Sequence, residues 1–175
     1  MFIACNKHSE SDQWFKGNLH THTFWSDGDA PPEITIDWYK NNGYDFLALS
    51  DHNILSISEK WIKVYDKDPG GWPPSMTKAK LNDVQNKFGS EWVNTRINND
   101  TLEMQLATLD KLKIKFESAN EFILIQSEEI SDKYEKTPIH INATNISEFI
   151  PPQGGNSVFD VLQRNINAVR EHMLS

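Results

Sequence analysis

Two histidines separated by one residue, His20 and His22, give the clearest sign of chemistry in this sequence. In an extended segment, residues two apart point to the same side, so both imidazoles can bind one cation or two neighbouring cations. Asp27 follows five residues after His22, and His52 follows thirty residues after it. Histidine and carboxylate side chains are ligands of zinc, manganese and iron in proteins. The spacing therefore predicts a divalent-metal site.

The segments around these residues predict a sheet edge that brings them together. Residues 14–19 are compatible with a strand, residues 31–43 have the proline start and glycine stop of a helix, and residues 45–50 form the apolar run of a covered strand. A right-handed crossover between parallel strands places the polar residues after each strand at the same carboxyl-terminal edge. Parallel sheets build their sites at that edge.

Histidine and acidic residues also occur within or just after two later apolar runs. Residues 122–126 precede Glu128 and Glu129, and residues 138–142 contain His140. We therefore expect four strands, each ending in histidine, aspartate or glutamate. This repetition matters because a single His-x-His pair is common in histidines that bind no metal.

These blocks resemble the PHP superfamily, named for polymerase and histidinol phosphatase. Its members are metal-dependent phosphoesterases on a distorted, TIM-like (β/α)7 barrel. The resemblance is carried by residues 18–28, 47–52, 128–131 and 139–141. It implies an α/β fold in which about four parallel strands with helices form part of such a barrel.

The resemblance also implies roles for individual residues. It implies six ligands for up to three divalent ions, zinc, manganese or iron: His20, His22, Asp27, His52, Glu129 and His140. Glu129 matches the bridging carboxylate because Ile130 and Ser131 follow it as in the family, and Glu128 remains an alternative.

The reaction implied by the resemblance is hydrolysis of a phosphate mono- or diester by metal-activated water. We expect Asp51, His52 and Glu129 to be the catalytic residues, with Asp51 orienting His52. The expected substrate is a small phosphorylated molecule, and Arg96 and Lys87 are candidate contacts to its phosphate. Two alternatives stay open: a metal-dependent hydrolase of a non-phosphate bond, and a non-catalytic domain that binds metal, ligands or partners.

The later motifs of the family do not occur in this sequence. A His-Pro motif and an Asp-x-His pair complete the family's site, but after His140 only His172 remains, on the expected solvent face of a helix over residues 157–173. A full barrel of this type needs about 200 to 250 residues, whereas the chain has 175. We therefore expect residues 14–175 to form the incomplete amino-terminal part of a PHP domain.

Residues 55–120 are predicted to be an insertion at the site edge of the sheet, and so a candidate lid or substrate-selecting cap. We expect four elements within it: a short helix over 57–65, a helix over 78–88, a hairpin of 92–97 and 101–106 with a three-residue loop, and a helix capped by Thr108.

The amino-terminal residues 1–13 are predicted to form a polar tail. Cys5 follows a small residue, as the lipid-receiving cysteine of a bacterial lipoprotein does. If Cys5 is that cysteine, the tail is a tether and the protein belongs to the bacterial cell envelope or periplasm; otherwise it is cytoplasmic. A single cysteine excludes an internal disulfide, and no stretch is long and apolar enough for a transmembrane segment.

The charge balance is acidic, with 17 basic and 25 acidic residues and a net charge of −8. No basic run follows the pattern needed to track a nucleic-acid backbone, so we expect no extended nucleic-acid partner. A small anionic substrate is compatible with this charge, because bound divalent ions would offset the local carboxylates.

Overall fold

The computed structural model describes residues 14–174. The described elements are, in chain order, β1 (Gly17–Asn18), α1 (Pro32–Asn41), β2 (Phe46–Leu49), β3 (Trp61–Lys63), α2 (Lys78–Phe88), the 3-10 helix η1 (Ser90–Trp92), β4 (Thr95–Asn98), β5 (Thr101–Gln105), α3 (Leu109–Phe116), β6 (Ile123–Tyr134), β7 (Thr137–Thr144) and α4 (Val158–Leu174). The predicted lipidation site Cys5 and the predicted tether over residues 1–13 lie outside the described residues. Within those residues, no helix has both the length and the apolar character needed to cross a membrane.

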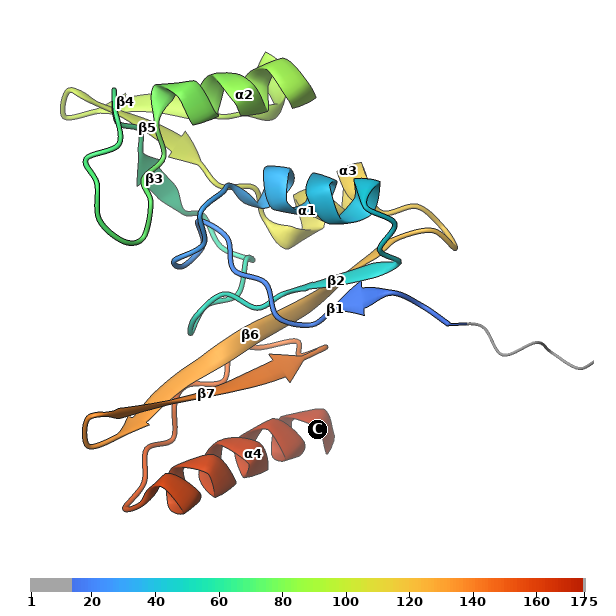
Figure 1. Ribbon diagram of the computed structural model, residues 1–175, viewed down its shortest axis with the longest axis vertical. Coiled ribbons are helices and arrows are strands. Elements are labelled where there is room, and N and C mark those ends of the chain that lie inside the picture. The colour runs from blue at the N-terminus through green and yellow to red at the C-terminus, as the bar shows by residue number, and fades with distance from the viewer. Residues whose placement is uncertain (1–13, 175) are drawn as a thin grey trace, which may run out of the picture.

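The main sheet has the strand order β1–β2–β6–β7, and β2 pairs in parallel with both β1 and β6. The predicted strand–helix–strand unit is confirmed, because α1 connects the parallel strands β1 and β2. Figure 1 shows this sheet as a curled layer with α1 and α3 above it and α4 below. The fold is therefore mixed α/β with a half-barrel sheet, and its predicted place within a TIM-like barrel stays a prediction.

The fourth strand is antiparallel, so the prediction of four parallel strands was wrong for β7. β6 runs for 12 residues, through Glu129 to Tyr134, and its pairing with β7 joins Tyr134 to Thr137. The intervening turn has Glu135 at a φ of 53°. A parallel partner needs a crossover of about a dozen residues or more. The two strands are too close in sequence for that, and a hairpin is the only connection possible.

Helix α1 positions the loop that precedes it. Pro32 stands in the first turn, where its missing N–H costs no hydrogen bond, and Gly43 ends the helix at a φ of 72°. Ile36 is fully buried in a core with Leu47 of β2 and Leu112 of α3. This packing anchors α1 on the sheet and so fixes the far end of the loop that carries His20, His22 and Asp27.

Successive residues of β6 point to opposite sides of the strand, and the two sides make different contacts. Leu124 packs in the core under α1 and α3, and Ile130 lies in a second core that Val169 of α4 covers. Glu129 and Ser131 point to the other side, where they meet histidines. Along β6, the side of Leu124 and Ile130 is therefore packed in the two cores, and the side of Glu129 and Ser131 carries the candidate site.

A second, three-stranded antiparallel sheet has the order β3–β5–β4. Its core joins Met104 of β5 and Val84 of α2 to Phe24 and Trp25, which come from the loop between β1 and α1. The segment 55–120 is thus attached to the loop that carries Asp27.

Three of the four elements predicted in this segment are confirmed. α2 and α3 are helices, and β4 and β5 form the hairpin, although its loop has two residues, Asn99 and Asp100, both with positive φ. Thr108 is the N-cap residue of α3, but its side chain makes no capping hydrogen bond. The predicted helix over 57–65 is wrong: the segment contains β3, whose pairing with β5 overrides the local helical spacing.

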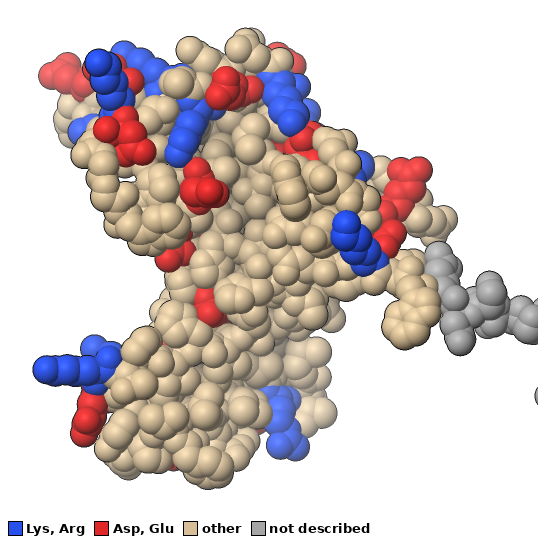
Figure 2. Space-filling view, in the orientation of Figure 1, with Lys and Arg blue, Asp and Glu red and all other residues tan. Residues whose placement is uncertain are grey.

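The charged side chains are unevenly distributed over the face shown in Figure 2. Both signs gather over the upper part, where β3, β4, β5 and α2 lie in Figure 1, and the middle of the face carries few charges. The outline is notched on the left, between this part and the part formed by β6, β7 and α4. The carboxyl ends of β1, β2 and β6 point toward that side.

Candidate metal centre

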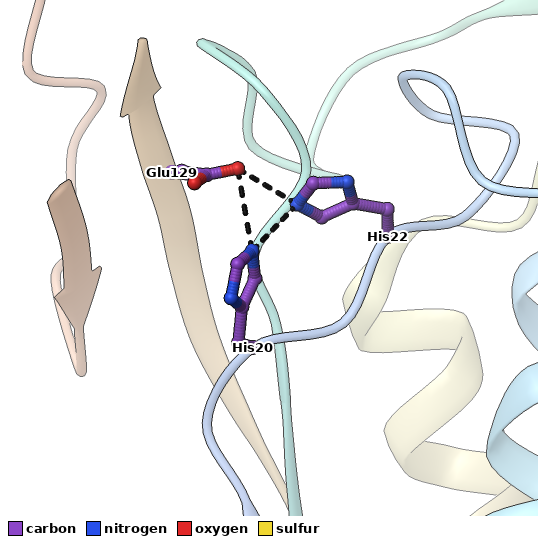
Figure 3. Close-up of side chains that lie close together, drawn as sticks. All are labelled: His20, His22 and Glu129. Carbon is purple, nitrogen blue, oxygen red and sulfur yellow. Dashed lines mark hydrogen bonds and ion pairs between the residues drawn. The ribbon is translucent and has the colours of Figure 1, made fainter. Parts of the chain in front are cut away.

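The six side chains that the sequence singles out as ligands lie together on one side of the main sheet. They come from the loop after β1, the end of β2 and the hairpin of β6 and β7, and are His20, His22, Asp27, His52, Glu129 and His140. Figure 3 shows His20 and His22 projecting from the loop toward Glu129 on β6. The structure therefore brings the predicted ligands together, while their binding of a metal stays a prediction.

Glu129 is the centre of this group. Its Oε2 lies 2.9 Å from His22 Nε2, 3.3 Å from His20 Nε2 and 3.1 Å from His52 Nδ1. Its Oε1 lies 3.1 Å from His140 Nδ1. The glutamate side chain is only 6% exposed, so these contacts replace water around the carboxylate.

The side chains form three overlapping groups in which the potential ligand atoms all lie within 4.8 Å of one another. The groups are His20, His22 and Glu129; His22, Asp27 and His52; and His52, Glu129 and His140. Each neighbouring pair of groups shares a residue, so the centre is continuous. Imidazole and carboxylate ligands in such sets suit zinc, manganese or iron.

One oxygen at the centre, Glu129 Oε2, is left without a hydrogen bond, as expected of an atom that binds a metal ion. Glu129 Oε2 is buried without a hydrogen-bond partner, because the three nearby ring nitrogens do not approach it with hydrogen-bond geometry. His20 Nε2 and His22 Nε2 also face each other at 3.1 Å. With zinc–ligand bonds of about 2.0–2.1 Å, ligand atoms of a tetrahedral site lie about 3.3 Å apart. The observed separations match that spacing.

His22 supplies a chemical reason for a cation. Its Nδ1 lies 2.9 Å from Asp27 Oδ1, and an ionised carboxylate only accepts hydrogen bonds, so the proton of a neutral His22 ring belongs on Nδ1. Nε2 of a neutral ring then carries a lone pair and lies 2.9 Å from Glu129 Oε2. Two electron-rich atoms at that distance repel each other unless a bound cation or a second proton on the ring offsets the repulsion. The residues present therefore fit a bound divalent ion.

Asp27 is held in its charged form by this surrounding. Burial alone would raise the pKa of Asp27, but the charges of His52 and His22 and hydrogen bonds from His22 and Trp72 lower it below its ordinary value. Its second oxygen lies 3.5 Å from His52 Nε2. Asp27 can therefore orient His22 through Nδ1, bind a cation beside His52, or do both.

Asp51 positions the loop rather than His52. Its side chain is buried, and its Oδ1 accepts hydrogen bonds from Thr23 N at 2.8 Å, Ser26 N at 2.9 Å and Ser26 Oγ at 2.7 Å, while Oδ2 accepts one from Thr23 Oγ1 at 3.0 Å. Burial raises the pKa of Asp51, and these hydrogen bonds oppose the rise. The predicted role, in which Asp51 orients His52, is replaced by one in which it fixes the turn between His22 and Asp27.

The turn closes so tightly that only glycine fits at position 28. A Cβ added to Gly28 would lie 2.5 Å from the His22 carbonyl group and from Thr23 N. The Gly28 N–H donates to Thr23 O at 2.9 Å. This close approach sets the direction in which His22 and Asp27 project.

His52 is oriented by two residues that sequence reasoning gave no role. Ser131 Oγ lies 2.5 Å from His52 Nδ1 and 3.5 Å from His140 Nδ1. Asn53 receives a hydrogen bond from Ser131 N at 2.8 Å and donates to Ser131 O at 3.0 Å. Asn53 has a φ of 48°, a conformation that asparagine tolerates better than most residues. That preference is the sequence signal that could have pointed to Asn53.

The alternative acid, Glu128, points to the opposite side of β6. It is fully buried, and its Oε1 accepts a hydrogen bond from Ile150 N at 2.7 Å. Burial raises the pKa of Glu128 to about 7, against the effect of that hydrogen bond. The geometry therefore favours Glu129 over Glu128 as a ligand.

The remaining sequence candidates lie outside the cluster. Arg96 donates from Nε to Glu103 at 2.6 Å and stacks 4.1 Å above the Trp61 ring, and Lys87 pairs with Asp37 at 2.5 Å. Arg96 and Lys87 are each already paired with a carboxylate, which argues against the phosphate contacts predicted for them. His172, predicted to face solvent, is half-buried and accepts a hydrogen bond from Ser147 N at 3.1 Å.

Lys60 is a cation near the centre that the sequence did not single out. It donates a hydrogen bond to the Trp25 carbonyl and, with Ser26, lines a cavity of about 270 Å³. Burial lowers the pKa of Lys60, and the charge of Asp51 opposes that shift. No sequence pattern marks this lysine, because its position depends on the packing of the second sheet.

Comparison with protein-family models and with curated proteins finds no match for this chain. The case for a functional site therefore depends on the geometry around Glu129: six side chains, from segments distant in sequence, form overlapping groups that can hold a metal ion.

Proposed function

We propose that this protein is a metal-dependent phosphoesterase of the PHP type, which hydrolyses a phosphate mono- or diester. The observation that carries the proposal is the buried Glu129 Oε2, faced by three histidine nitrogens at 2.9–3.3 Å and lacking a hydrogen-bond partner. The resemblance of the loop and strand motifs to the PHP superfamily adds the reaction class.

The proposed ligands divide among the three overlapping groups, with Glu129 shared between the first and third. Divalent ions held there would supply Lewis-acid polarisation of a phosphoryl oxygen and a water with a lowered pKa. The chain itself supplies orientation. Asp51 fixes the turn that presents His22 and Asp27, and Ser131 holds the His52 ring.

Two other functions use the same centre. A hydrolase of a non-phosphate bond needs the same polarising ions, and a non-catalytic domain needs only the ligands. The phosphoesterase is preferred because the motifs match in order as well as in residue type, through residues 18–28, 47–52, 128–131 and 139–141.

The test is metal content and phosphate release measured on the same preparations. The chain is purified, loaded with zinc, manganese or iron(II), and assayed on phosphate monoesters and diesters with and without chelator. His22→Ala is expected to lose metal and at least about 100-fold in rate. His172→Ala is the matched control, since it removes a histidine that belongs to none of the three groups.

Equal rates with and without chelator would contradict the proposal. A metal-loaded wild type that cleaves carboxylate esters or amides, but no phosphate ester, would favour the second hydrolase. Stoichiometric metal with no turnover on either class would favour the non-catalytic domain.

A further inference from the structure

A cavity of about 450 Å³ opens beside the first metal group. Two of its lining residues, His20 and His22, are themselves proposed ligands. The rest of the wall comes from Thr21 between them, from the end of the loop before α1 and from α1 itself, through Asp29, Ala30, Ile34, Thr35, Trp38 and Tyr39. A molecule in this cavity would therefore lie directly against the metal centre.

Trp38 is the largest side chain in the wall, and 55% of it is exposed. It lies one helical turn after Ile34, so both residues occupy the same face of α1. Tyr39 packs edge-on against the Trp38 ring at 5.1 Å and against Tyr44 at 4.8 Å. These contacts hold the indole in place while more than half of it remains accessible. An exposed, supported indole is a platform on which a flat ring can stack.

The polar groups of the wall disfavour a negatively charged group. Asp29 can accept a hydrogen bond, and Tyr39 Oη already accepts one from Asn18 Nδ2 at 2.7 Å, which leaves its own proton to donate. The lining residues of this cavity include no lysine or arginine. A second phosphate group placed there would meet Asp29, while Lys80, which lies outside the lining, already donates from Nζ to the Asp29 carbonyl oxygen at 3.1 Å.

We infer that this cavity binds the alcohol portion of the substrate, and that this portion carries a flat ring, without negative charge, stacked on Trp38. The inference rests on the proposed function for the placement of the phosphate at the metal centre. The substrate class is then a phosphate ester with one phosphate group and a ring-bearing alcohol. Trp38 is a specificity residue that binds the ring and leaves the reaction step to the centre.

The kinetic test compares benzyl phosphate with ethyl phosphate on the metal-loaded chain. Their alcohols have similar reactivity as leaving groups, so the difference in KM reports ring binding. Wild type is expected to have a KM for benzyl phosphate about tenfold below that for ethyl phosphate. Trp38→Ala is expected to remove that difference by raising the KM for benzyl phosphate, and Trp38→Phe is expected to restore most of it. Trp14→Ala is the matched control, because Trp14 is 91% exposed and lies outside the cavity lining.

A binding measurement separates this inference from the proposed function. Benzylphosphonate, which is not hydrolysed, is titrated into isotope-labelled protein, and the indole N–H signal of Trp38 is followed. A shift with benzylphosphonate but not with ethylphosphonate supports the ring site even if no ester is hydrolysed. An unshifted indole signal, or the same KM ratio in wild type and Trp38→Ala, overturns the inference and leaves the phosphoesterase proposal standing.

Discussion

His22 Nε2 lies 2.9 Å from Glu129 Oε2, although the two residues come from a loop and a strand that are far apart in sequence. His22 Nδ1 meanwhile contacts Asp27, so Nε2 of a neutral ring carries the lone pair close to a carboxylate. A bound cation, or a second proton on the ring, removes the repulsion between the two atoms. Metal binding and the stability of the fold are therefore expected to be coupled.

The first prediction concerns metal addition. Zinc or manganese at about 100 times its dissociation constant is expected to raise the free energy of unfolding of the wild type by about 2.7 kcal/mol. Glu129→Gln, which keeps the side-chain shape, is expected to abolish that increase. Glu148→Gln changes an exposed glutamate and serves as control. Thermal unfolding with metal and with chelator measures the effect, and a Glu129→Gln protein that metal stabilises as much as wild type would contradict it.

The second prediction concerns the turn held by Asp51. Asp51→Asn replaces an acceptor oxygen by an N–H donor where Thr23 and Ser26 both donate. We expect a loss of about 1–3 kcal/mol in the free energy of unfolding without metal, and weaker metal binding because His22 and Asp27 are less firmly placed. Urea unfolding in chelator gives the first quantity and calorimetric titration the second. Asp83→Asn, at an exposed position on α2, is expected to change neither.

The third prediction concerns Gly28. Gly28→Ala adds a methyl group 2.5 Å from the His22 carbonyl group, so the loop must move and strain of about 1–3 kcal/mol is expected. Metal affinity is expected to fall with stability, since the same loop carries two of the proposed ligands. A Gly28→Ala protein with wild-type metal affinity would show that the turn does not set the ligand geometry. Metal titration followed by unfolding of the same sample tests both effects.

The fourth prediction concerns pH and lies away from the centre. Glu33 is 1% exposed, its Oε1 accepts a hydrogen bond from Trp92 Nε1 at 2.9 Å, and its Oε2 has no partner. Burial raises the pKa of Glu33, and the Trp92 hydrogen bond and the charges of Lys111 and Lys115 oppose the shift. The folded state therefore binds this proton more tightly than the unfolded state. Its contribution to stability is fully present below the unfolded pKa and is lost as pH rises through the folded pKa.

Glu33→Gln keeps the acceptor for Trp92 and removes the charge. It is expected to be more stable than wild type at neutral pH, and the difference is expected to shrink toward pH 4. Urea midpoints across that range, measured in chelator so that the metal centre does not contribute, test the sign. A wild type that gains stability relative to Glu33→Gln as pH rises would refute the assignment.

Local sequence signals determined several elements correctly. The proline start and glycine stop of α1, the apolar run of β2 and the turn residues of the β4–β5 hairpin act over a few residues, and the structure confirms each element. The resemblance to the PHP superfamily also implied the six side chains that the structure brings together. Glu129 was preferred to Glu128 from its following residues, and strand alternation places only Glu129 on the side of the histidines.

Other features depended on contacts between segments distant in sequence. β3 is a strand because β5 pairs with it, and β7 is antiparallel because β6 continues past Glu129 into a tight turn. Arg96 donates a hydrogen bond to Glu103 across the hairpin. Lys60 donates one to the Trp25 carbonyl, a contact that forms only when the second sheet packs on the loop.

The sequence by itself determined which residue types could bind metal and which helices and strands would present them, because spacing and turn signals are local. Only the tertiary structure determined the direction in which each of those side chains points. Asp51 turns to the loop and Ser131 to His52, and a cavity beside His20 and His22 is lined by Trp38. Such directions follow from burial and pairing across the whole fold, which no short stretch of sequence contains.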